Sequence, residues 1–242
     1  MGVIKAAIGD ALLTSMWVFC MPMLRILTGI IATFLSVQAL PWAALFITTI
    51  LVSCLVFLFS LIGEALGGAS FNPTASLTFY AAGLKKNSSL LSMAVRFPAQ
   101  AAGGVAGVKA ILQVIPGEYK KFIKGPSLNV DLHTGAIAEG VLTFGLSLAL
   151  LVILFRGPKN PLIKLWLMAA STVGLVTTGS KYTGPSMNPA NAFGWAYENN
   201  WHNSWELYYV YWIGPSIGAT LAAWVFRFLL SPPPLASKEK KA

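Results

Sequence analysis

Two Asn-Pro pairs, Asn72-Pro73 and Asn188-Pro189, are the residues of this sequence whose chemistry is most specific. Asn is among the best residues for capping a helix N-terminus, because its side-chain carbonyl accepts an otherwise unpaired backbone N–H. Pro at the first helical position lacks an N–H that would be unpaired in any case. Each pair is therefore expected to begin a helix, the first running from Asn72 to Gly83 and the second from Asn188 to about Tyr197.

These two expected helices are too short to cross a membrane. Twelve residues from Asn72 to Gly83 span roughly 18 Å, a little over half of a hydrocarbon core about 30 Å thick. Two such N-termini meeting near the midplane would each present a partial positive charge of about +0.5, which repels cations. The asparagine amides would meanwhile donate hydrogen bonds to a passing oxygen, so the pattern predicts passage of a neutral solute without protons.

The composition requires a membrane around these helices. Of 242 residues, 56% are hydrophobic and only 10% are charged, and the mean hydropathy is +0.68, far from the composition of soluble proteins. The net charge of +9 is dispersed at segment ends, which argues against nucleic acid as a partner. We expect an all-α integral membrane protein in a lipid bilayer, with six spans at 6–27, 41–63, 90–115, 134–155, 163–180 and 207–230.

The distribution of Lys and Arg predicts the orientation of the spans. Most basic residues fall on one side if six spans alternate, which places both termini in the cytoplasm. Three lysines between the third and fourth spans, Lys120, Lys121 and Lys124, oppose this assignment. No charged residue occurs between Ile26 and Gly63, so the first connecting loop, 28–40, is expected to be partly embedded in the membrane.

The chain also repeats itself. Asp10-x-x-x-Thr14 near the start of the first span matches Glu139-x-x-x-Thr143 near the start of the fourth, and an Asn-Pro pair follows each. Three spans per repeat force the halves into opposite orientations, with a solute path between them. We therefore expect one transmembrane channel domain, 1–242, with a first repeat at 1–115, a second at 134–230 and a basic cytoplasmic tail at 231–242.

These features together resemble the aquaporin (major intrinsic protein) family, and within it the type-one small basic intrinsic proteins of plants. The resemblance implies six transmembrane helices with two re-entrant half-helices, a homotetramer with one pore per protomer, and passive water permeation. We expect no enzymatic activity, no cofactor and no metal, because the sequence has no nucleophile–base pair or cofactor motif and its two histidines, His133 and His202, are isolated. The two boxes of the pore would be Asn72, Pro73 and Thr74, where Thr replaces the usual alanine, and Asn188, Pro189 and Ala190.

The resemblance also implies an outer selectivity constriction. Spacing from the boxes assigns it to Val52, Val176, Pro185 and Asn191, with Asn191 where most family members have arginine. This set is less polar than a water-selective constriction that contains histidine and arginine. We therefore expect a wider, more hydrophobic opening that depends on the Asn72 and Asn188 region to exclude protons.

Three polar residues within the spans have structural interpretations. Asp10 and Glu139 are expected to hold the backbone of the re-entrant loops, rather than to act in the pore. Gln100 resembles a family position that supports the fourth-span acid, Glu139, although a span glutamine is also common as a hydrogen-bonding contact between helices. The glycine pairs at 103 and 107 and at 214 and 218 predict close helix crossings.

The C-terminal residues have two interpretations. Lys238 and Lys240 match the spacing of an endoplasmic-reticulum retrieval signal, which the family resemblance favours, and a basic patch attracted to anionic lipid is the alternative.

Three alternatives to a water channel remain open. The same pore could admit glycerol, hydrogen peroxide or another small neutral solute. Inverted repeats with broken helices also occur in coupled secondary transporters, and a hydrophobic constriction could close the pore in a non-conducting structural protein.

Overall fold

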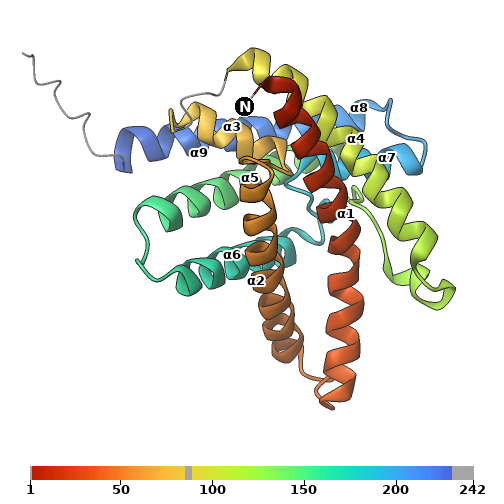
Figure 1. Ribbon diagram of the computed structural model, residues 1–242. Coiled ribbons are helices and arrows are strands. Elements are labelled where there is room, and N and C mark those ends of the chain that lie inside the picture. The colour runs from red at the N-terminus through yellow and green to blue at the C-terminus, as the bar shows by residue number, and fades with distance from the viewer. Residues whose placement is uncertain (1, 85–88, 231–242) are drawn as a thin grey trace, which may run out of the picture.

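The computed structural model describes residues 2–84 and 89–230, and in these ranges the regular structure is helical throughout (Figure 1). The predicted all-α fold class is confirmed. The elements are α1 (Val3–Phe34), α2 (Pro41–Ala65), α3 (Pro73–Ala81), α4 (Leu90–Val114), η1 (Gly117–Phe122), α5 (Leu132–Phe155), α6 (Pro161–Gly179) and α7 (Pro189–Glu198), followed by one continuous helical segment composed of α8 (Trp205–Tyr208), η2 (Tyr209–Ile213), α9 (Gly214–Val225) and η3 (Phe226–Leu230).

Five helical segments in the described part of the chain are long and apolar enough to cross a membrane: α1, α2, α5, α6 and residues 205–230. The remaining predicted span, 90–115, corresponds to α4, a helix of 25 residues. It contains Arg96, Gln100 and Lys109, of which the first two are buried inside the protein. Polar side chains that face neighbouring helices explain why hydropathy alone ranks this helix below the others.

The end of the first helix differs from the sequence expectation. Helix α1 continues to Phe34 instead of ending near residue 27, so the connection before α2 is only a short turn in which Ser36 adopts a φ of 57°. The reason is local, because nothing between Ile26 and Phe34 other than Gly29 disfavours a helix, and even Pro22 lies within it. The predicted boundary, and the long first loop that depended on it, are wrong.

Glycine pairs bring the long helices into backbone contact, as predicted. A Cβ atom on Gly103 or Gly107 of α4 would lie 2.3 or 2.4 Å from a backbone oxygen of α1, and one on Gly214 or Gly218 of α9 would lie 2.6 or 2.0 Å from a backbone oxygen of α5. Only glycine permits these crossings. Where α4 crosses α1, the close approach brings Arg96 and Gln100 within hydrogen-bonding distance of Asp10.

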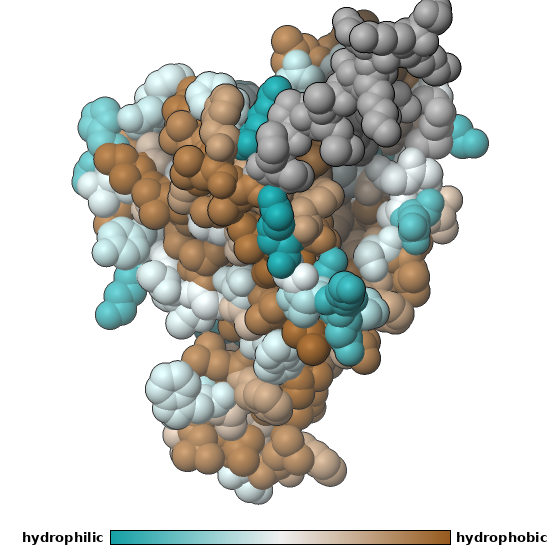
Figure 2. Space-filling view, turned by 90° about the vertical axis from the view of Figure 1, so that its left-hand side faces the viewer, coloured by the Kyte–Doolittle hydropathy of each residue, from teal (hydrophilic) through white to brown (hydrophobic). Residues whose placement is uncertain are grey.

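Hydrophobic residues, in brown, form broad areas of the coloured surface in Figure 2 and make up much of the projection at the bottom. In Figure 1 this projection is formed by the far ends of α1 and α2. Several of its side chains are largely exposed, such as Phe34 at 85% and Trp42 at 80%. Such a surface is suited to lipid, where apolar side chains face outward.

Candidate functional site

The two Asn-Pro pairs begin the short helices α3 and α7. The Asn72 side-chain oxygen accepts the backbone N–H of Thr74 at 2.9 Å, and that of Asn188 accepts the N–H of Ala190 at 3.1 Å. Pro73 and Pro189 are the first helical residues. The helices span Pro73–Ala81 and Pro189–Glu198, so the predicted starts are correct and the predicted ends shift by one or two residues.

The side chains of the two asparagines hold the two loops together in a reciprocal manner. Asn72 Nδ2 donates to the carbonyl of Met187, the residue before Asn188, at 3.0 Å. Asn188 Nδ2 donates to the carbonyl of Phe71, the residue before Asn72, at 3.0 Å. A primary amide has two N–H donors, and with its oxygen fixed by the helix cap, each asparagine retains one donor for a solute.

Thr74, the departure from the usual first box, reinforces this contact. Its hydroxyl lies 3.0 Å from the Met187 carbonyl and 2.8 Å from Asn72 Oδ1. The side chain is 3% exposed and is not among the residues that line the cavity at Asn72 and Asn188. Threonine therefore adds a polar link between the two loops where alanine would add none.

Glu139 of α5 holds the second loop. One carboxylate oxygen accepts the Ser186 N–H at 2.9 Å and the Thr183 hydroxyl at 2.8 Å, and the other accepts the Met187 N–H at 2.9 Å. Met187 has a φ of 46°, a strained conformation for a residue with a side chain. Its N–H and its carbonyl are both hydrogen-bonded, and these contacts offset the strain.

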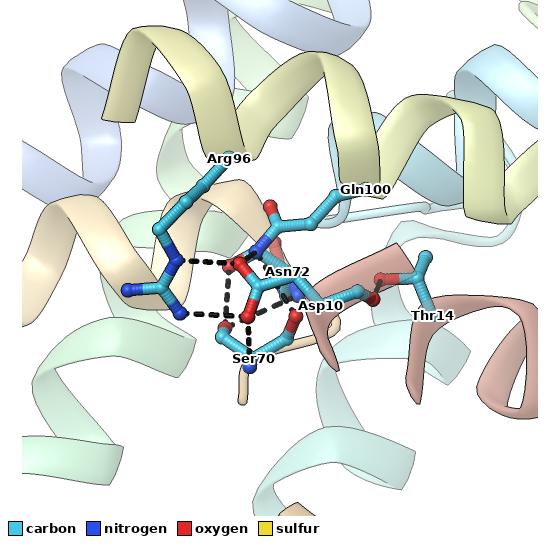
Figure 3. Close-up of polar contacts among 6 residues, drawn as sticks. All are labelled: Asp10, Thr14, Ser70, Asn72, Arg96 and Gln100. Carbon is cyan, nitrogen blue, oxygen red and sulfur yellow. Dashed lines mark hydrogen bonds and ion pairs between the residues drawn. The ribbon is translucent and has the colours of Figure 1, made fainter. Parts of the chain in front are cut away.

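Asp10 of α1 holds the first loop, but through a different arrangement (Figure 3). Its carboxylate accepts the Ser70 N–H at 2.8 Å and also pairs with Arg96 of α4 through two contacts of 2.7 Å. Gln100, one turn further along α4, donates to Asp10 at 2.8 Å and to the Ser70 carbonyl at 3.0 Å. All three side chains are buried.

Two of these findings correct or extend the sequence analysis. Gln100 contacts Asp10 and not Glu139, because the glycine crossing packs α4 on α1 and directs its polar side chains there. Arg96 was not identified from the sequence, although its position four residues before Gln100 places both on one face of the helix. The paired carboxylate and guanidinium bury no net charge.

A cavity of about 200 Å³ connects the two loops with the surrounding helices. The structure brings together along its wall both box asparagines and all four residues expected at the constriction, Val52, Val176, Pro185 and Asn191. In the described part of the chain, no ionisable side chain lines this cavity. Asn191 Nδ2 donates to Ser186 Oγ at 3.1 Å, which fixes its amide at the wall.

Some predicted features lie outside the described residues. The predicted basic tail at 231–242, with Lys238 and Lys240, lies there.

Comparison with known proteins agrees with this geometry. The family model described as Major intrinsic protein matches residues 2–226. The sequence is 55% identical over 241 residues to "Aquaporin SIP1-1" of Oryza sativa subsp. japonica, covering 99% of this chain and 98% of the relative. It is 50% identical over 243 residues to "Aquaporin SIP1-1" of Arabidopsis thaliana, covering both chains completely. The resemblance to type-one small basic intrinsic proteins is confirmed.

The fold also matches a solved structure. The X-ray structure of the aquaglyceroporin from Plasmodium falciparum superposes with a TM-score of 0.69, covering 96% of this chain and 98% of that one, at 20% sequence identity. At this identity the match supports the fold and not the solute.

Proposed function

This chain belongs to the major intrinsic protein family, whose members are membrane channels and not enzymes, and on that premise we propose that it conducts water passively and excludes protons and ions. The observation that carries the proposal is the reciprocal contact of Asn72 and Asn188 at the wall of an uncharged cavity. The proposal includes two inverted repeats, 1–115 and 134–230, with the solute path between them.

Proton exclusion would arise from the ends of the half-helices. The N-termini of α3 and α7 meet where Asn72 and Asn188 line the cavity, and each carries a partial positive charge of about +0.5. A water oxygen that accepts from both amides orients its hydrogens away from the pair, which interrupts a chain of proton transfer. A hydronium ion would be repelled by the same positive ends.

The range of solutes depends on the outer residues. The outer positions carry no fixed charge and no aromatic ring, since they are Val52, Val176, Pro185 and Asn191. The lack of both supports a wider opening than that of a water-selective constriction. Glycerol, hydrogen peroxide or a similar neutral molecule is therefore the second candidate solute for the same path.

Stopped-flow shrinkage of proteoliposomes under an impermeant osmolyte tests the proposal. We expect shrinkage several times faster than in empty liposomes, slowed by Asn191→Trp at the cavity wall and unchanged by Ile137→Trp, whose site is 66% exposed on α5. An entrapped pH dye should report no added proton flux. Shrinkage at the empty-liposome rate with folded protein would refute water conduction, whereas saturable, gradient-coupled uptake would indicate a transporter.

We also propose a homotetramer in the membrane of the endoplasmic reticulum, with both termini in the cytoplasm. Native mass spectrometry in detergent should give the mass of four chains. An N-terminal fluorescent fusion should remain in the reticulum, and Lys238→Ala with Lys240→Ala should release it to later compartments. Lys241→Ala is the matched control, because it removes a charge without altering the retrieval spacing, and equal release by it would favour a simple basic patch.

A further inference from the structure

An aromatic cluster lies beside the first Asn-Pro box. The ring of Trp17 stacks on that of Phe71, with centroids 4.0 Å apart and planes 14° from parallel. Phe59 packs edge-on against both, at 5.1 Å from Trp17 and 6.0 Å from Phe71. Phe59 is 2% exposed and supports the stack from the interior, so the pair has little freedom to move.

This stack lines the same cavity as the box asparagines. Trp17 and Phe71 are the two aromatic side chains among the lining residues in the described part of the chain. Phe71 precedes Asn72, and its carbonyl accepts the hydrogen bond from Asn188. The rings are therefore fixed relative to both amide donors, and they stand at the level of the asparagines rather than at the outer residues.

The other lining residues restrict solutes less firmly. The outer residues are small or of medium size: Val52, Val176, Pro185 and Asn191. The cavity is also lined by Met21 and Met168, whose flexible side chains can change conformation to make room for a neighbouring group. By contrast, the rings of a stacked aromatic pair that a third ring supports cannot move without losing their packing contacts. The firmest part of the wall is thus at the asparagine pair.

We propose that Trp17 and Phe71 form an inner selectivity filter, which sets the size limit for neutral solutes at the level of the Asn-Pro boxes. The inference rests on the proposed channel function. A solute must fit between a rigid apolar face and the two amide donors. Water does so as a single molecule, and a polyol must bring its carbon skeleton against the rings.

Permeability ratios in proteoliposomes test the filter. We expect Trp17→Leu to raise the ratio of glycerol to water permeability by about tenfold, the lower end of the discrimination that one methylene of misfit provides in an apolar pocket. Trp17→Phe keeps a ring and should raise the ratio less. Trp42→Leu, at a position 80% exposed on α2, removes a tryptophan away from the cavity and should leave the ratio unchanged.

The outcomes separate this inference from the proposed function. A folded Trp17→Leu protein with an unchanged ratio would overturn the filter while leaving water conduction intact. If Trp17→Leu does not fold, Phe71→Leu, at a half-buried loop position, provides the same test. If the wild-type protein conducts no water, the channel proposal fails. The filter is then supported only when one of these variants begins to conduct, and is refuted when both remain inactive.

Discussion

At the scale of single residues, the two loop-supporting acids differ in how their charge is balanced. Asp10 is paired with Arg96 through two contacts of 2.7 Å, and Glu139 is held by a hydroxyl and two backbone N–H groups. Arg96→Met would leave Asp10 buried and unpaired, which costs about 3–5 kcal/mol and lowers the melting temperature by roughly 10 °C. Thermal unfolding of the purified protein in detergent measures this change.

A second substitution controls for lost packing. Combining Arg96→Met with Asp10→Asn removes the unpaired charge, so we expect the double variant to melt at a higher temperature than Arg96→Met alone. Equal melting temperatures would mean that the guanidinium contributes through its apolar contacts and not through the ion pair.

Thr74 allows a milder change at the box itself. Thr74→Ala removes the hydroxyl that lies 3.0 Å from the Met187 carbonyl, at a cost of about 1 kcal/mol. Water permeability should persist, because Asn72 still donates to that carbonyl and the backbone N–H at position 74 still caps its oxygen. Asn72→Ala, which removes both contacts, should abolish permeability in the same vesicle assay, and a similar loss in Thr74→Ala would assign the hydroxyl a larger role.

At the scale of elements, the position of α7 depends on its contact with α4. A Cβ on Gly194 would lie 2.5 Å from the Gly104 carbonyl oxygen, so Gly194→Ala must displace the half-helix and its cap Asn188. Overpacking of this kind costs about 1–3 kcal/mol, and we expect reduced water permeability together with a lower melting temperature.

Gly174 of α6 provides the matched control for that substitution. A Cβ there would meet no atom within 4 Å, and alanine favours a helix over glycine by about 1 kcal/mol. Gly174→Ala should therefore preserve permeability and stability. Equal effects of the two substitutions would show that α7 is not held by the glycine contact.

The same elements show which features the sequence could predict. The half-helices begin where expected because the capping chemistry of Asn-Pro is local, and the glycine crossings follow from spacing alone. The end of α1 was missed because an apolar segment without charge contains no signal that stops a helix before Ser36. The partner of Gln100 could not be predicted, since it depends on which helix α4 crosses and not on any neighbouring residue.

At the scale of the whole molecule, orientation in the membrane can be tested independently of transport. The proposed topology places the segment between α4 and α5 opposite the termini, despite the lysines at 120, 121 and 124. The basic residues on the other side, among them Lys5, Arg156 and Lys159, outnumber them and should determine the orientation. The three lysines after α4 would then cross the membrane during insertion, and the basic residues of the other loops would outweigh their preference for the cytoplasm.

Glycosylation reports this orientation directly. An Asn-x-Thr acceptor introduced within 123–131 should be glycosylated in microsomes, because that segment would face the lumen. The same acceptor placed within 157–160, between α5 and α6, should remain unmodified. So should the native Asn87-Ser88-Ser89 sequence, whose acceptor Asn87 lies outside the described residues. The reverse glycosylation pattern would indicate the opposite orientation of the chain in the membrane. The tail would then lie in the lumen, where Lys238 and Lys240 could not act as a cytoplasmic retrieval signal.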